Sequence, residues 1–374
     1  MMPCLRLASA LLSSMTVMPV ASFASQPVSN CDAEGRTYFA YVAAESADEV
    51  YLVQFDGESA SVVRRIDVGV LPTEIEGPHG LTVDPSGDFW YLTMAHGIPY
   101  GTLYKYRTAN DELMGRVELG LFPATLQMSV DTGLLYCVNF DLHGDMTPSS
   151  VSIVDPEEMV EVARTTTGPM PHGSRLSPDG RFHYSCAMMT DELFEIDAAS
   201  FDVTRTLRLT DGTGGIARKR SDGHHAAVTK PTWVHPHPKK NKLFVCLNGA
   251  AQVVEVDRKA WRITRRFPTA KGPYNVEVTP KGDRFVVTYK GAASVGVWDT
   301  KSGEELERIP TTRRITHGVA ISSDSRYAFV SSEGIGGESG TVDVIDLETN
   351  ELVATVEVGL QAGGITFWKV EESK

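Results

Sequence analysis

Alternating apolar and polar residues, followed by a turn signal, begin each repeat of this chain. Four such runs start at Pro78, Pro171, Pro273 and Thr316. Alternation of this kind predicts a β-strand, and the Pro-x-Gly triplets that end the first three runs predict tight turns. A second, apolar run follows each turn, at residues 89–94, 182–187, 285–289 and 327–331. The pattern therefore predicts repeated pairs of antiparallel strands.

Two further runs complete each repeat. The third run usually ends in aspartate, at residues 56, 155, 197, 257, 299 and 346. The fourth run is more polar, as at residues 61–68 and 304–309. Short, charged outer strands keep a sheet edge from pairing with other chains. We therefore assign the fourth run to the outside of the molecule.

The repeat has a period of about 43 residues. The first strands, once aligned, place equivalent residues, which we call mouth positions, at His79, Ala124, His172, Thr232, Tyr274, His317 and Ala362. One spacing is longer than the others because residues 211–229 are inserted before Thr232. Four strands at this period are typical of a β-propeller blade.

The two ends of the chain predict how the propeller closes. Residues 37–43 form a second strand without a first, and residues 362–368 form a first strand without a second. We therefore predict an all-β, seven-bladed β-propeller of four-stranded antiparallel blades. Its ring is closed by pairing of the C-terminal strand with the N-terminal blade. An open solenoid is the alternative, and it would leave residues 362–368 without partners.

These repeats resemble the YVTN family of bacterial propellers. Tyr136-Cys137-Val138-Asn139 stands where that family has its namesake tetrapeptide, and the third strands that end in aspartate also match. The resemblance runs from about Thr37 onward and implies a propeller scaffold. Similar propellers occur in nitrous oxide reductase, in thiocyanate dehydrogenase, in the large subunits of periplasmic amine dehydrogenases and in proteins without a known catalytic role. The shared fold therefore does not imply one function.

The N-terminal residues have the pattern of a secretion signal. Arg6 supplies a positive charge, residues 7–20 are mostly apolar, and Ser22-Phe23-Ala24 fits the small-x-small rule for cleavage. We expect residues 1–24 to be a signal peptide and residues 25–374 to be a single propeller domain in the periplasm or outside the cell. A membrane anchor is the alternative, but a span needs about 20 apolar residues, and no later segment is apolar enough either.

The charge of the chain limits its partners. The formal net charge is −13, which argues against a phosphate-binding surface and hence against nucleic acid. We expect a small-molecule ligand or a periplasmic protein partner instead. The cysteines that follow the signal are Cys31, Cys137, Cys186 and Cys246. An oxidising compartment permits disulfides among them, whereas the apolar runs around the last three equally predict buried thiols.

Histidines gather on one predicted face of the propeller. The first strands begin on the same face as the loops between second and third strands. His79, His172 and His317 occupy three of the mouth positions, and Tyr274 occupies a fourth. Four more histidines belong to this face, in two of the loops and in the insertion: His96, His143, His224 and His225. We therefore expect imidazoles from separate blades to meet at the channel mouth.

Imidazole is a ligand suited to copper, zinc and iron. We predict a transition-metal site, with copper as the metal, formed by His79, His172 and His317 and supplemented by the loop and insertion histidines. The arrangement resembles the copper-bearing propeller of nitrous oxide reductase, and it implies an oxidoreductase acting on a small molecule. As an alternative, these histidines are repeat-consensus residues that bond backbone between blades.

Two other function classes remain open at this stage. A non-catalytic propeller would present its rim to a protein or ligand as a scaffold. A hydrolytic propeller of the lactonase type would need a base and a cation at the mouth, for which Glu333 and Arg175 are the candidates. Tyr274 is a further catalytic candidate at the mouth. We expect Glu333 to be a solvated carboxylate and Arg175 to project into the channel.

Overall fold

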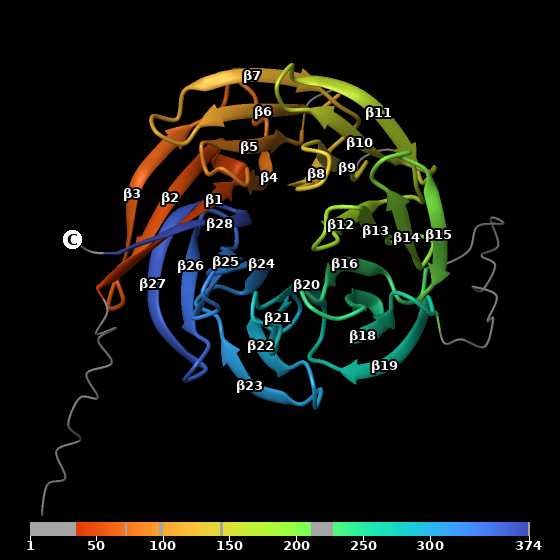
Figure 1. Cartoon of the computed structure of the whole chain (residues 1–374). Helices are drawn as coiled ribbons and strands as arrows, with labels where there is room; N and C mark the ends of the chain where they lie inside the picture. The colour runs from red at the N-terminus through yellow and green to blue at the C-terminus, as the bar shows by residue number, and fades with distance from the viewer. Residues whose placement is uncertain (1–34, 72, 97–99, 143–144, 211–226, 373–374) are drawn as a thin grey trace, which may run out of the picture. The chain divides into compact units, whose positions relative to one another are not determined.

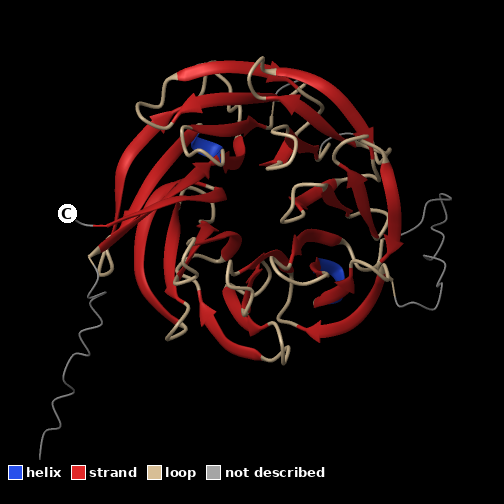
Figure 2. Ribbon diagram, in the orientation of Figure 1, coloured by secondary structure: helices blue, strands red, loops and turns tan. Residues whose placement is uncertain are grey.

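A computed structural model describes residues 35–71, 73–96, 100–142, 145–210 and 227–372. Within these residues the strands form seven four-stranded sheets, arranged as blades around a central channel (Figure 1). The predicted all-β, seven-bladed propeller is confirmed. The described part is almost entirely strand, with two short 3-10 helices, η1 (Glu45–Ala47) and η2 (Asn248–Ala250) (Figure 2).

The blades are numbered from the one that contains the first strand, and the strands of each blade run in order from the channel outward. Blade 1 contains β28 (Ala362–Glu372), β1 (Arg36–Ala44), β2 (Glu49–Phe55) and β3 (Ala60–Asp67), and blade 2 contains β4 (Pro78–Val83), β5 (Phe89–Met94), β6 (Thr102–Arg107) and β7 (Leu113–Glu118). Blade 3 contains β8 (Pro123–Met128), β9 (Leu135–Asn139), β10 (Ser150–Asp155) and β11 (Val160–Thr166), and blade 4 contains β12 (Pro171–Leu176), β13 (Phe182–Ala187), β14 (Glu192–Asp197) and β15 (Val203–Arg208).

Blades 5 to 7 repeat the same order. They contain β16 (Pro231–Pro236), β17 (Lys242–Leu247), β18 (Gln252–Asp257) and β19 (Arg262–Pro268); β20 (Pro273–Val278), β21 (Arg284–Tyr289), β22 (Ser294–Asp299) and β23 (Glu305–Pro310); and β24 (Ile315–Ile321), β25 (Tyr327–Glu333), β26 (Ser339–Asp346) and β27 (Glu351–Leu360).

The ring closes through β28, which pairs antiparallel with β1 along its length (Figure 1). Ala44 lies opposite Ala362 at the channel end of this pair, and Arg36 lies opposite Glu372 at the far end. The last strand therefore completes the blade that the first three strands begin, as predicted, and an open solenoid is excluded.

One mouth position was aligned wrongly. Ala362 pairs with Ala44 as Pro78 pairs with Met94, so Gly363, and not Ala362, is equivalent to His79. The backbone marks the same register in both blades. Gly77, which precedes Pro78, has a φ of 67°, and Gln361, which precedes Ala362, has a φ of 57°. The sequence hides this register, because neither Gly363 nor Gly364 provides a side chain to align.

The core lies between neighbouring blades. Between blades 1 and 2, for example, the ring of Trp90 stacks on Tyr41 at 5.2 Å and on Tyr106 at 4.1 Å between centroids. The outer strands alternate between exposed and half-buried residues, as in β7, which fits their predicted place at the rim. The outer strands are therefore the least buried, and the innermost strand of each blade lines the channel.

Three cysteines lie in this core as buried free thiols: Cys137, Cys186 and Cys246. Of the two alternatives left open by the sequence, buried thiols are therefore correct for these three, while Cys31 and the expected signal peptide lie outside the described residues. No described helix has the length and apolar character of a membrane span.

Candidate metal centre

Three histidine rings meet at one end of the channel. His79 of β4, His172 of β12 and His317 of β24 each offer a ring nitrogen, and the three nitrogens lie within 4.8 Å of one another. The Nε2 atoms of His79 and His172 are 3.4 Å apart. All three side chains are buried. The structure therefore brings together rings from blades 2, 4 and 7, far apart in the sequence, as the mouth positions predicted.

The glycine after each histidine allows this convergence. A Cβ atom on Gly80 would lie 1.9 Å from the Ala124 carbonyl oxygen, and one on Gly173 would lie 2.4 Å from that of Thr232. Both distances are far inside van der Waals contact. Because glycine follows each histidine, neighbouring innermost strands can lie close together. The channel is therefore narrow at the mouth positions.

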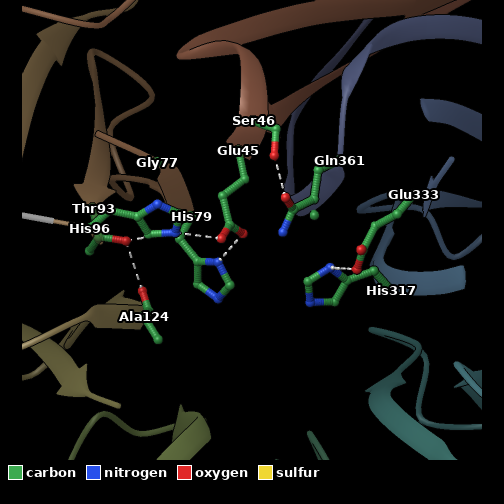
Figure 3. A network of polar contacts seen from close by, with 12 residues as sticks. Glu45, Ser46, Gly77, His79, Thr93, His96, Ala124, His317, Glu333 and Gln361 are labelled. Carbon is green, nitrogen blue, oxygen red and sulfur yellow. Dashed lines mark hydrogen bonds and ion pairs between the residues drawn. The ribbon is translucent and has the colours of Figure 1, made fainter. Parts of the chain in front are cut away.

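Two buried glutamates lie behind two of the histidines (Figure 3). Glu45 Oε2 is 2.8 Å from His79 Nδ1, and Glu333 Oε1 is 3.0 Å from His317 Nδ1. Each glutamate directly follows or ends the second strand of a blade, β1 and β25 respectively. Because their Nδ1 atoms face carboxylates, His79 and His317 present Nε2 to the centre.

His96 lies on the other side of Glu45. Its Nε2 is 2.8 Å from Glu45 Oε1 (Figure 3), so it faces that carboxylate and not the three rings. The hydrogen bond to Glu45 raises the pKa of His96 above its usual value. The sequence grouped His96 with the metal ligands; the structure places it behind Glu45 instead. His143, His224 and His225 lie outside the described residues.

Burial favours the neutral imidazole at His172 and His317, and nearby groups favour the ionised carboxylate at Glu333. Burial, followed by the positive charge of Lys290, lowers the pKa of His317 to about 4. Burial also holds the pKa of His172 well below its usual value. Burial by itself would raise the pKa of Glu333, but the hydrogen bond to His317 and the nearby charges lower it to about 2. A metal site needs this protonation pattern, because only a neutral imidazole has a lone pair to donate.

Tyr274 and Lys290 complete the centre. The hydroxyl of Tyr274 is 2.9 Å from His172 Nε2. The ammonium of Lys290 is 2.8 Å from Glu333 Oε1 and lies 4.6 Å from the centroid of the Tyr274 ring. Glu333 is thus held between His317 and Lys290. The expectation that Glu333 is solvated is wrong, because the end of β25 lies inside the channel mouth, where its side chain is buried.

Arg175 borders the channel as expected, but a partner holds it. Its guanidinium is 3.2 Å from Glu277 Oε2 and lies over the ring of Trp233. Glu277 also lies 3.2 Å from His235 Nε2. These contacts form a second polar layer in the channel, and the catalytic role suggested for Arg175 stays a prediction.

Sequence reasoning missed Glu45. This residue precedes the first recognisable inner strand, so no complete repeat frames it. An alignment of the residues at the channel end of each second strand would have found it: Glu45, Ala95, Phe140, Met188, Asn248, Lys290 and Glu333. Three of these positions carry a charge, and all three charges lie at the centre.

The comparisons with known proteins identify the scaffold. A family model described as the cytochrome D1 heme domain matches residues 279–371. No curated protein matches the chain significantly. Among solved structures, Kuenenia stuttgartiensis hydrazine synthase matches with a TM-score of 0.60 and 19% identity, over 76% of this chain and 80% of that chain. At this identity the likeness shows the propeller fold alone.

A haem does not fit between the three rings. The space that they border, together with Arg175 and Trp233, measures about 30 Å³, whereas pockets for larger organic ligands begin at about 300 Å³. The 3.4 Å between His79 Nε2 and His172 Nε2 leaves no room for a macrocycle. The matched segment 279–371 also contains only His317 of the three. A single ion fits these donors and this space.

Proposed function

We propose that this protein is a metalloprotein that binds one transition-metal ion, copper, through the Nε2 atoms of His79, His172 and His317, and that the ion supports an oxidoreductase reaction on a small molecule. The observation that carries the proposal is the group of three buried imidazoles whose donor atoms lie within 4.8 Å of one another. Repeat-consensus histidines that bond backbone would not direct their nitrogens at one point.

The contacts behind the rings support metal binding. Histidine ligands commonly donate their second ring N–H to a carboxylate, which fixes the tautomer and strengthens the ligand. His79 has that hydrogen bond with Glu45, and Glu333 faces His317 Nδ1 in an ion-pair contact of 3.0 Å. The 3.4 Å between the Nε2 atoms of His79 and His172 is close to the ~3.3 Å expected for two nitrogens each about 2.0–2.1 Å from a tetrahedral ion.

The donor type supports a short list of metals. Three neutral imidazoles suit copper and zinc, and either metal binds at least one further ligand beside them. Copper is the sequence-based choice and supplies redox chemistry, while zinc would supply Lewis-acid chemistry alone. The protein's part is to hold the three nitrogens, to keep Glu45 and Glu333 ionised behind them, and to limit the space above them to a small molecule.

A scaffold function is the second candidate, and the surface of the same face supports it. Large exposed apolar residues occur on the loops that surround the channel mouth: Val70, Leu71, Ile75, Tyr100, Leu121, Leu142, Met146, Val228 and Ile335. A surface of this kind suits a protein partner. The two functions are compatible, because a partner over the mouth would lie next to the metal. We also propose that residues 1–24 export the chain to the periplasm or the medium.

Metal analysis tests the proposed function. Purified protein is incubated with copper or zinc, freed of unbound ion, and analysed by mass spectrometry. We expect about one ion per chain in the wild type and none in the triple variant His79→Ala/His172→Ala/His317→Ala. His235→Ala is the matched control, because it removes a partly buried channel imidazole that faces Glu277. Equal, substoichiometric metal in the wild type and the triple variant would remove the proposal, and reversible reduction of the bound ion separates copper from zinc chemistry.

A further inference from the structure

We propose that Tyr274 is a fourth ligand of the metal at the three histidines, bound through its oxygen as a phenolate. This inference rests on the proposed function and deepens it, because it sets the charge and the metal preference of the site. The position of the Tyr274 hydroxyl carries this inference.

Tyr274 has the same place in its blade as the histidines have in theirs. It follows Pro273 at the start of β20, as His79 follows Pro78 and His172 follows Pro171. Its hydroxyl lies 2.9 Å from His172 Nε2, which is also the nitrogen that faces His79. Its ring centroid is 4.8 Å from that of His317. The hydroxyl oxygen therefore belongs to the same cluster of donor atoms as the three imidazoles.

Metal binding would remove the hydrogen-bond partner of the Tyr274 hydroxyl. His172 Nε2 is the one hydrogen-bond partner of the Tyr274 hydroxyl among the described residues, and a metal would take the lone pair of that nitrogen. Tyr274 is half-buried, and a phenol that loses its protein partner there is disfavoured. Coordination removes that cost, because the oxygen exchanges its contact with His172 for a bond to the ion that His172 also binds.

Without an ion the phenol keeps its proton, because burial, followed by the charges of Glu333 and Glu45, raises the pKa of Tyr274 well above its usual value. The phenolate therefore forms only when the ion displaces the proton. The ammonium of Lys290 lies 4.6 Å from the centroid of the Tyr274 ring and is paired with Glu333. The binding step balances simply: the phenol O–H bond breaks, an oxygen–metal bond forms, the proton passes to solvent, and no electron is transferred. A phenolate beside three neutral imidazoles reduces the net charge of a divalent site by one.

The test loads wild-type protein, Tyr274→Phe and Tyr289→Phe with Cu(II). Tyr289 is the matched control, because it is buried in the same blade and its hydroxyl bonds Glu305 away from the centre. Phenolate bound to Cu(II) produces a charge-transfer absorption in the visible range, whereas imidazole alone does not. We expect this band in the wild type and Tyr289→Phe, and its loss in Tyr274→Phe, which retains about one copper per chain.

Two further measurements make the outcomes distinct. Resonance Raman spectra of the wild type excited in this band should show tyrosinate ring vibrations, which tests the ligand even if Tyr274→Phe folds poorly. Copper loading should release about one proton more from the wild type than from Tyr274→Phe, as followed with an indicator dye. Stoichiometric copper without the band in the wild type, or with the band retained in Tyr274→Phe, would overturn the fourth ligand and leave the proposed function standing. A wild type that binds no copper would overturn both.

Discussion

The Glu45 carboxylate lies 2.8 Å from His79 Nδ1, and Glu333 forms the equivalent contact with His317 at 3.0 Å. Glu45 comes from blade 1, which precedes the blade of His79, whereas Glu333 comes from the same blade as His317. Both glutamates lie at the mouth end of the second strand of their blade. His172 differs, because no ion pair joins its Nδ1 to a carboxylate among the described residues. The centre therefore consists of two imidazoles whose Nδ1 atoms face carboxylates and a third whose Nε2 contacts the Tyr274 hydroxyl.

The contact between Glu45 and His79 predicts the effect of removing the charge of this carboxylate. In Glu45→Gln the side chain keeps its size but loses the charge that strengthens His79, so we expect metal affinity to fall about 10- to 100-fold. Competition with a chelator measures the change. Glu49→Gln is the control, because Glu49 is a buried carboxylate of the same blade that bonds Tyr51 and Arg65 instead. Equal affinity in Glu45→Gln and the wild type would contradict the role of Glu45.

The narrowness of the channel mouth predicts the effect of a single methyl group. Gly80→Ala puts a Cβ atom against the Ala124 carbonyl, 1.9 Å away in the present backbone. The strands must separate, and overpacking of this kind typically costs about 1–3 kcal/mol. We expect a lower free energy of unfolding and weaker metal binding, as measured by denaturant titration and by metal analysis. Gly337→Ala should change neither property, because nothing lies within 4 Å of its Cβ position.

The sequence could predict the fold because each repeat contains its own evidence. Residues 78–94 and 273–289 each combine an alternating strand, a turn and an apolar strand, and this combination recurs at one period. The three histidines were predictable for the same reason, since they occupy a repeated position on the channel side. Glu45 was not, because it lies before the first complete repeat. The burial of Glu333 depends on how far β25 extends toward the channel, which no local pattern indicates.

His183 predicts a pH dependence that is separate from the metal centre. Its ring stacks on Tyr136 at 5.2 Å, and neither of its ring nitrogens has a hydrogen-bond partner among the described residues. Burial lowers its pKa to about 3. Between pH 6.5 and about 3 the unfolded chain therefore binds a proton that the folded chain does not, so the free energy of unfolding falls as the pH falls.

We expect His183→Phe to remove this term. Phenylalanine keeps the stacking on Tyr136 and buries no polar atom, so the variant should be more stable than the wild type by about 1–3 kcal/mol. The advantage should grow below pH 6.5, by up to about 1.4 kcal/mol per pH unit. Denaturant titrations at pH 7.5, 6.5 and 5.5 measure the difference. A stability difference that is constant or shrinks toward low pH would contradict the assignment.

Ring closure by β28 predicts how the chain responds to truncation. A chain that ends at Gln361 loses the innermost strand of blade 1, so the channel-side edge of β1 is left unpaired. The channel wall next to His79 and His317 is also lost, because Gly363 and Gly364 pack against these two histidines. We expect a lower melting temperature, loss of a single cooperative transition, and association through the free edge of β1. A chain that ends at Glu372 is the control, since it retains all of β28; equal melting of the two chains would show that the ring is stable without this strand.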